Sequence, residues 1–416
     1  MALKRVVVTG LGAITPIGNN FQEYRKALLE GVSGAGPITL FDATNFKTKF
    51  ACELKQYNPE DYFERKDVRK YDRCAQFGMI SSKEAVKDSK LLEYSDLNKA
   101  RVGVVWGSGI GGLNTFEQEV STYALGNGIP RFNPFFIPKM IADMTPGLIS
   151  MEYGFMGPNY ATVSACASSS NAMIDSLMLI RLGKADAIVT GGSEAAICAS
   201  GVGGFNALHA MSTRNDDPAT ASRPFDKDRD GFVLGEGSGT LILEEYEHAV
   251  KRGATIYAEI VGGGLSADAY HMTAPHPEGL GAYNVMKNAI EDAGISLTDI
   301  DHINVHGTST PLGDLAESKA ILKLFGEHSY KIQINSTKSM TGHLLGAAGA
   351  IEALACVIAV KENIVAPTIN HFTDDEDFDP KLDFTFNKAK EKEVKYAMSN
   401  TFGFGGHNAC VILKKF

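Results

Sequence analysis

The sequence ATVSACASSSNAMIDS, residues 161–176, joins an apolar, β-branched approach to a helical pattern through a single cysteine, Cys166. The helical pattern continues as far as Arg181, and Gly183 follows it as a typical helix stop. Between Cys166 and Gly183 only Asp175 and Arg181 are charged, so we expect this helix to be buried. A strand that leads through small residues into a helix is the unit of α/β proteins.

The same unit recurs along the chain in two ordered sets of five. The strand candidates of the first set are KRVVVTGLG, RVGVVWGSGIGG, YATVSACASS, DAIVTGGSEA and GSGTLILEE. Those of the second set are YAEIVGGGLSAD, DHINVHGTST, KIQINSTKSMTG, KYAMSNTFGFGG and HNACVILKKF. Because the order is kept, we expect two related halves, 1–255 and 256–416, with insertions at 44–100 and 110–160. Repetition by chance among α/β units is the alternative.

Composition is that of a globular protein, with 44% hydrophobic and 21% charged residues among 416. A formal net charge of −9 argues against a general nucleic-acid binder. The N-terminus reads directly into a strand, which predicts no secretory signal and a cytoplasmic protein. The apolar stretch LLGAAGAIEALACVIAV is interrupted by Glu352, so it predicts a buried helix rather than a membrane span.

Six cysteines are scattered without CxxC spacing, so we expect free thiols and no zinc site. Cys166 differs from the others because it lies at the start of the predicted helix. Unpaired N–H groups and partial positive charge at a helix N-terminus lower a thiol's pKa and activate it as a nucleophile. A buried structural cysteine is the alternative for Cys166, and it is our interpretation of the other five.

Two histidines follow predicted strands of the second half on glycine-rich turns, His306 in INVHGTSTPLGD and His343 in STKSMTGHLLGAAGAIEA. If the halves face each other, both histidines point toward Cys166. Neutral imidazoles that donate from Nε2 would hold a carbonyl oxygen and stabilise a developing enolate. The FGFGG turn, residues 402–406, would add a backbone N–H and a movable Phe404. Structural histidines and an aromatic-plugged turn are the alternatives.

Four motifs in order, SACASSSNA, VHGTSTPLGD, STKSMTGHLLGAAG and NTFGFGGHN, resemble those of the β-ketoacyl-acyl carrier protein synthases, especially the elongating type II enzymes. The resemblance spans essentially the whole chain. It implies a thiolase-like α/β fold with duplicated halves in a five-layer αβαβα arrangement, and a homodimer. It also implies a Cys-His-His triad of Cys166, His306 and His343.

The resemblance implies roles for further residues. Lys338 would lie beside the triad with Glu352 as its ionic partner, and the N–H groups of Cys166 and Phe404 would form the oxyanion hole. The remaining residues would contact substrate: Thr308 and Thr310 the pantetheine arm, Ile110 the acyl tunnel, and Phe402 the substrate beside the gating Phe404.

The implied reaction is a decarboxylative Claisen condensation, in which an acyl group on Cys166 is extended by malonyl-acyl carrier protein. No free cofactor or metal is needed, because 4'-phosphopantetheine arrives on the carrier protein. A polyketide ketosynthase would share the triad. A non-catalytic chain-length partner would lack Cys166, and a Cys-His hydrolase would need no malonyl group. A thiolase or an initiating synthase fits the motifs less well.

An acidic carrier protein needs a basic surface. The segment ERKDVRKYDR supplies such a cluster, and two further arginines are weaker candidates. These docking candidates are Arg65, Lys66, Arg69, Lys70, Arg131 and Arg214. A solvated helix face is the alternative. The stretch LHAMSTRND carries His209 where the family often has an arginine, so one carrier contact differs. We expect neither nucleic acid nor a membrane as a partner.

Overall fold

The computed structural model describes residues 3–416 and shows an α/β protein built on one ten-stranded sheet. Its helices are α1 (Phe21–Glu30), α2 (Arg65–Val68), α3 (Arg73–Ser89), α4 (Leu113–Leu125), α5 (Phe136–Met140), α6 (Met144–Tyr153), α7 (Ser168–Arg181), α8 (Ala199–Ala207), α9 (Tyr246–Lys251), α10 (Leu280–Ala293), α11 (Pro311–Phe325), α12 (Lys338–Thr341) and α13 (Ala348–Glu362). The strands of the large sheet are β1 (Val6–Ile14), β4 (Val102–Gly107), β5 (Asn159–Thr162), β6 (Ala187–Glu194), β7 (Gly237–Glu245), β8 (Ala258–Ala267), β9 (His302–Asn304), β10 (Gln333–Asn335), β13 (Tyr396–Gly403) and β14 (His407–Lys414). The two-residue strands β2 (Gly36–Pro37) and β3 (Phe50–Ala51) pair with each other, as do β11 (Ile364–Val365) and β12 (Lys390–Glu391).

The ten strands repeat one topology twice. The sheet order is β10-β9-β13-β14-β8-β1-β7-β6-β4-β5, so each set of five, numbered along the chain, has the spatial order 3-2-4-5-1. The directions also match, since the two outer pairings of each set are parallel and the inner ones are antiparallel. The two sets meet where β1 pairs with β8. All ten strands predicted from the sequence are present.

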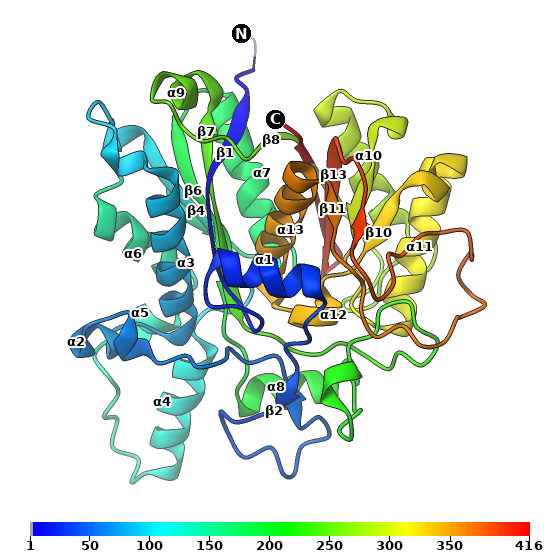
Figure 1. Ribbon diagram of the computed structural model, residues 1–416. Coiled ribbons are helices and arrows are strands. Elements are labelled where there is room, and N and C mark those ends of the chain that lie inside the picture. The colour runs from blue at the N-terminus through cyan, green and yellow to red at the C-terminus, as the bar shows by residue number, and fades with distance from the viewer. Residues whose placement is uncertain (1–2) are drawn as a thin grey trace.

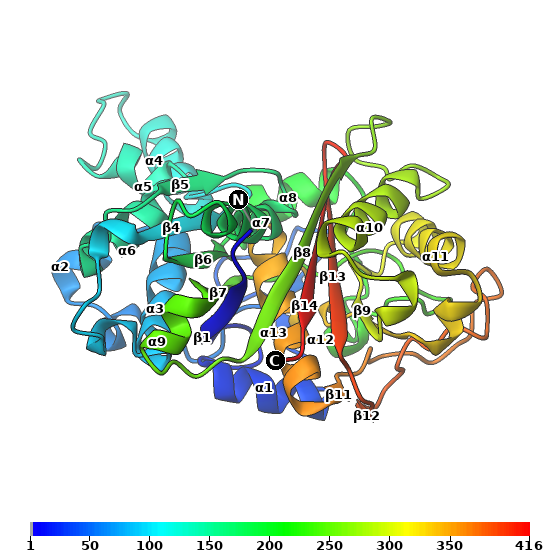
Figure 2. The same cartoon turned by 90° about the horizontal axis from the view of Figure 1, so that it is seen from above.

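Helices cover both faces of each half and produce five layers (Figures 1 and 2). Helices α7 and α13 contact each other and lie between the halves, where their side chains share one hydrophobic core with β1, β7, β8 and β14. On the outer faces, α3 packs on β1 and β7, while α10 packs on β8 and β14. This arrangement is the thiolase-like αβαβα fold expected above.

The predicted insertions are too broad. Helix α3 lies within 44–100, yet it connects β1 to β4 and covers the outer face as α10 does in the other half. Helix α6 likewise packs on α3, as α11 packs on α10. The extra segments of the first half are therefore the stretch before α3, the projecting helices α4 and α5, and the connection 195–236 with α8, which replaces the short turn between β13 and β14 (Figure 1).

The apolar stretch near the C-terminus forms α13, which is buried over all but its last two residues. Within residues 3–416, none of the helices is long and apolar enough to cross a membrane.

Candidate active site

Cys166 lies at the turn between β5 and α7. Ala165 has a positive φ of 50°, and α7 begins at Ser168, so the sulfur is placed just before the first helical turn. Gly183 ends this helix with a φ of 68°, as the sequence predicts. Cys166 is only 8% exposed, and it lies in the wall of a cavity of about 410 Å³ formed by both halves of the chain.

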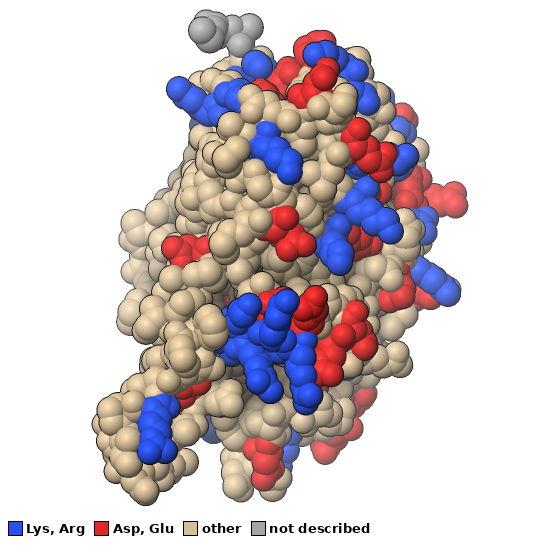
Figure 3. All heavy atoms as spheres, turned by 90° about the vertical axis from the view of Figure 1, so that its left-hand side faces the viewer, with Lys and Arg blue, Asp and Glu red and all other residues tan. Residues whose placement is uncertain are grey.

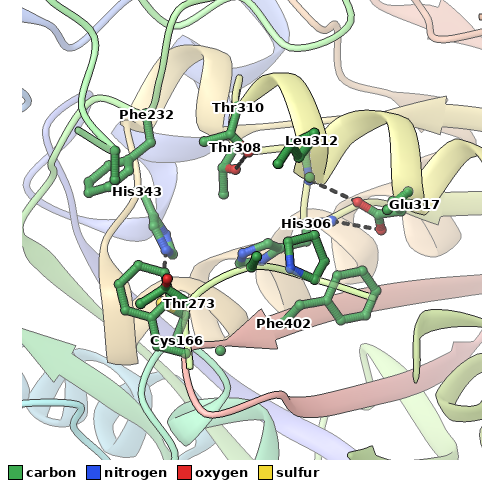
Figure 4. Close-up of a pocket in the computed structure, with 18 of the residues that line it drawn as sticks. Cys166, Phe232, Thr273, His306, Thr308, Thr310, Leu312, Glu317, His343 and Phe402 are labelled. Atoms are coloured by element: carbon green, nitrogen blue, oxygen red, sulfur yellow. Dashed lines mark hydrogen bonds between the residues drawn. The ribbon is translucent and has the colours of Figure 1, made fainter. Parts of the chain in front are cut away.

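One predicted histidine contacts this cysteine, and the other lies beside it in the same cavity. His343 Nε2 lies 3.0 Å from Cys166 Sγ, and the rings of His343 and His306 are 5.2 Å apart and nearly perpendicular. Figure 4 shows the two rings side by side in the pocket that Cys166 lines. Within residues 3–416, neither Nδ1 has a hydrogen-bond partner. A proton on Nδ1 would be a buried, unpaired donor, so the geometry favours neutral rings that donate from Nε2.

The backbone around each histidine is held by separate contacts. The N–H groups of His306 and Gly307 both donate to the carboxylate of Glu317 over 3.0 Å (Figure 4). The N–H of His343 donates to the carbonyl of Val233 over 2.7 Å, and the ring of Phe232 meets the His343 ring edge-on at 5.5 Å. These contacts fix the backbone from which each of the two rings projects.

Burial keeps both histidines uncharged. It lowers the pKa of His306 and of His343 well below 6.5, and the positive charge of Lys338 lowers both further. Each ring therefore stays neutral at physiological pH and can donate a hydrogen bond from its N–H.

The thiol of Cys166 departs from the prediction. We expected the helix N-terminus to lower its pKa, but burial raises the pKa of Cys166 to about 12. Lys338 and the backbone N–H of Phe404 act in the opposite direction and lower it, whereas Glu194 and Glu352 add to the increase. Desolvation of the thiolate in this buried site outweighs the positive charge of Lys338.

Lys338 lies behind the triad rather than in the cavity. It begins α12, is 1% exposed, and its ammonium group bonds Oε1 of Glu352 on α13. Burial raises the pKa of Glu352 to about 7, and Lys338 opposes that increase. The ion pair predicted from the sequence is therefore present, and its positive end acts on Cys166 and both histidines through space.

Four of the predicted substrate contacts line the cavity: Thr308, Thr310, Phe402 and Phe404. The hydroxyl oxygens of Thr308 and Thr310 are 3.0 Å apart, and the ring of Phe404 lies 6.4 Å from that of Phe205. Ile110 does not line this cavity, and 42% of it is exposed.

The glycine-rich turn is tied to a second loop that the sequence did not indicate. Gly405 donates its N–H to the carbonyl of Met272 over 2.7 Å, and Asp268 donates to the carbonyl of Gly406 over 2.9 Å. Thr273, from the same second loop, also lines the cavity (Figure 4). The mouth of the cavity is therefore formed by two loops that contact each other.

None of the basic docking candidates lines the cavity, and most of them are exposed on the surface. Figure 3 shows the face on the left-hand side of Figure 1, where lysine and arginine side chains gather with acidic side chains beside them. Arg65, Lys66 and Arg69 on or next to α2 are exposed, and Lys70 is half-buried. Of these, Arg65, Lys66 and Lys70 form ion pairs with neighbouring acidic residues. Arg131 is exposed as well, whereas Arg214 donates to the carbonyl of Asp228.

Two buried carboxylates at the site were missed. Glu317 holds the His306 turn, and Glu194 accepts hydrogen bonds from Gly109, Ile110 and Gly346. The spacing of Asp314 and Glu317, three residues apart on α11, could have indicated Glu317, because acidic residues spaced that way share one face of a helix. The position of Glu194, at the end of an otherwise apolar strand, could likewise have indicated that this carboxylate is buried.

Nothing in the described chain, residues 3–416, forms a group of three or more His, Cys, Asp or Glu side chains that could hold a metal ion. All six cysteines are free thiols and all are buried.

Comparison with known proteins agrees with this geometry. Residues 3–249 match the family described as "Beta-ketoacyl synthase, N-terminal domain", and residues 257–372 match "Beta-ketoacyl synthase, C-terminal domain". The chain is 49% identical over 413 residues to "3-oxoacyl-[acyl-carrier-protein] synthase 2" of Synechocystis sp., covering 99% of this chain and 98% of that protein.

Solved structures give the same relationship. A β-ketoacyl synthase from Burkholderia phymatum is 36% identical with a TM-score of 0.91, covering 99% of this chain and 100% of that one. A ketosynthase solved with its type II polyketide acyl carrier protein and a bound hexaketide is 32% identical with a TM-score of 0.90, covering 100% of both chains.

Proposed function

This chain belongs to the β-ketoacyl synthase family, and on that premise we propose that it is an elongating 3-oxoacyl-acyl carrier protein synthase, an acyltransferase of fatty acid synthesis. The observation that supports this best is the 3.0 Å contact between Cys166 Sγ and Nε2 of a buried His343, with His306 beside it. The halves 1–255 and 256–416 contribute the nucleophile and the two histidines respectively.

In the first step, Cys166 takes an acyl group from a carrier-protein thioester. Its sulfur bonds to the acyl carbon, the bond from that carbon to the pantetheine sulfur breaks, and the thiol proton ends on the departing pantetheine sulfur. The N–H groups of Cys166 and Phe404 hold the oxyanion of the tetrahedral intermediate. Because the pKa of Cys166 is raised, this step depends on the nearby charge of Lys338 and on the N–H of Phe404.

In the second step, malonyl-carrier protein enters. His306 and His343 donate their Nε2 protons as hydrogen bonds to the thioester carbonyl. The bond to the carboxylate breaks, CO2 leaves, and the electron pair forms an enolate stabilised by these two donors. The enolate carbon attacks the acyl carbon, and Cys166 leaves as a thiolate that takes a proton from solvent. The product is a 3-oxoacyl thioester two carbons longer.

The carrier protein brings the only prosthetic group this chemistry needs, its 4'-phosphopantetheine arm. Thr308 and Thr310 offer paired hydroxyls in the wall of the cavity, at a place where an amide-containing arm needs polar partners. The basic residues around α2 provide attraction for an acidic carrier protein. One related structure is that of a ketosynthase in complex with an acyl carrier protein.

We also propose that two copies associate through β5. This strand is one edge of the ten-stranded sheet, and it is followed by Val163, which is 63% exposed. Met151 and Met156, before the strand, are 68% and 71% exposed. An unpaired edge with exposed apolar neighbours is suited to strand pairing with a second copy.

Intact-mass spectrometry tests the first step. Mixing the protein with octanoyl-carrier protein should add the mass of one octanoyl group, and Cys166→Ala should abolish the adduct. An octanoyl group that leaves without malonyl-carrier protein, as free acid, would favour a hydrolase. A Cys166→Ala variant that still acquires the group would contradict the assignment of the nucleophile.

A further inference from the structure

Glu194 is a buried carboxylate for which the proposed chemistry has no use. It ends β6, has no exposed surface, and no ion pair within residues 3–416 includes it. Its Oε2 accepts the N–H of Gly109 over 2.7 Å and that of Gly346 over 3.0 Å. Its Oε1 accepts the N–H of Ile110 and the hydroxyl of Ser108, both over 3.3 Å. A carboxylate buried without a cation is costly, so four donors converging on it require an explanation.

The donors come from two segments that are far apart in sequence and adjacent in space. A methyl group added at Gly346 would lie 2.2 Å from the backbone N of Gly109 and 2.7 Å from Glu194 Oε2. One added at Gly109 would lie 2.8 Å from the same oxygen and 3.2 Å from the carbonyl of Ala165, next to the nucleophile. Glu194 therefore clamps the segment 108–110 onto the turn 345–347, next to the turn that carries Cys166.

This clamp separates the cavity from Ile110. Leu345, in the clamped turn, lines the cavity with Cys166, whereas Ile110, in the clamped segment, does not. An acyl chain on Cys166 must leave the mouth free for the arm that delivers the second substrate. A long chain therefore needs room beyond the cavity wall at Leu345, and the 108–110 segment lies directly against the turn that carries Leu345.

We propose that Glu194 is a specificity-determining residue, which limits the length of the acyl chain accepted by Cys166 by holding the 108–110 segment against the 345–347 turn. The proposal rests on the function proposed above. Short chains fit without moving the wall, and long chains must displace it. Burial raises the pKa of Glu194 to about 7, and the hydrogen bonds from the two segments oppose that increase.

The test compares acyl transfer from hexadecanoyl- and octanoyl-carrier protein for the parent protein and for Glu194→Gln. The amide keeps the size of the side chain but turns an NH2 group toward backbone donors. The ratio of the two kcat/KM values, long to short, should rise about tenfold, the scale on which pocket size discriminates between chains. Ser108→Ala removes one donor and should raise the ratio by less, which keeps the proposal testable if Glu194→Gln folds poorly.

Glu84→Gln is the matched control. Glu84 also accepts hydrogen bonds from two backbone N–H groups, those of Ala13 and Phe21, but it lies outside the site. The ratio of long-chain to short-chain kcat/KM for Glu84→Gln should therefore equal that of the parent. An unchanged or lower ratio in both Glu194→Gln and Ser108→Ala would overturn the proposal. A parent protein that transfers no acyl group at all would instead refute the proposed function.

Discussion

Replacing Lys338 by Met should separate the electrostatic role of the buried ion pair from its structural one. The ammonium group of Lys338 bonds Glu352, and both side chains are essentially unexposed. Removing the cation leaves a buried carboxyl that must hold a proton. For a group with an ordinary pKa of 4.5 this costs about 3 kcal/mol at pH 7, at about 1.4 kcal/mol for each pH unit. That agrees with the ~3–5 kcal/mol typical of breaking a buried pair.

Lys338→Met/Glu352→Gln removes the unpaired charge as well. We expect urea unfolding to show a loss of about 3 kcal/mol for the single variant, most of which the double variant restores. Activity should not be restored with it. Without the charge of Lys338 the pKa of Cys166 rises further, so acyl transfer, measured by intact mass, should slow in both variants.

The acyl-transfer step and the decarboxylation step can be measured separately. Malonyl decarboxylation, followed as CO2 release, should also slow, because the donors to the enolate lose the field of Lys338. Full condensation activity in the double variant would refute the electrostatic role. A double variant as unstable as the single one would refute the pairing calculation.

Three further predictions concern the histidines, the turn and the surface. Since the pKa of His343 is lowered, the unfolded chain takes up a proton below pH 6.5 that the folded protein does not. Because of this histidine, the free energy of unfolding of the parent falls by about 1.4 kcal/mol for each pH unit below 6.5. Asparagine takes up no proton, so His343→Asn should lose less stability than the parent between pH 6.5 and 5, as measured by urea unfolding. Gly403→Ala places a methyl group 2.7 Å from the backbone carbonyl of Ser164 and 3.1 Å from the backbone N of Cys166, so the backbone must shift there. Both the acylation rate and the unfolding midpoint should fall, and an unchanged acylation rate would contradict the role of this turn. Lys66→Glu/Arg69→Glu should raise KM for acyl-carrier protein about tenfold and leave a small acyl thioester unaffected, whereas equal effects on both donors would exclude docking at α2.

The fold was predictable because its signals are local. Each strand is a short β-branched run ended by glycine or serine, and the matched order of ten such runs indicated two related halves. The helix after Cys166 was equally clear, since Gly183 ends it and its charges are few. The predicted bounds of the insertions were wrong because α3 and α10 do not resemble each other in sequence. The two helices nevertheless lie at equivalent positions and cover the outer faces of their halves in the same way.

The chemistry was only partly predictable. Cys166, His306 and His343 could be brought together by assuming that the halves face each other. The raised pKa of Cys166 could not be foreseen, because desolvation depends on side chains from the whole chain. Glu194 was missed for a similar reason, since the N–H groups that it accepts belong to segments more than a hundred residues apart.

The most direct test of the account is a balance of products from a single turnover. Octanoyl-loaded protein is mixed with malonyl-carrier protein, and the CO2 released is compared with the octanoyl groups lost from Cys166. We expect one CO2 for each octanoyl group lost, and we expect every octanoyl group to be recovered within a ten-carbon 3-oxoacyl thioester on the carrier protein. Octanoyl groups released as free octanoic acid, without matching CO2, would contradict it.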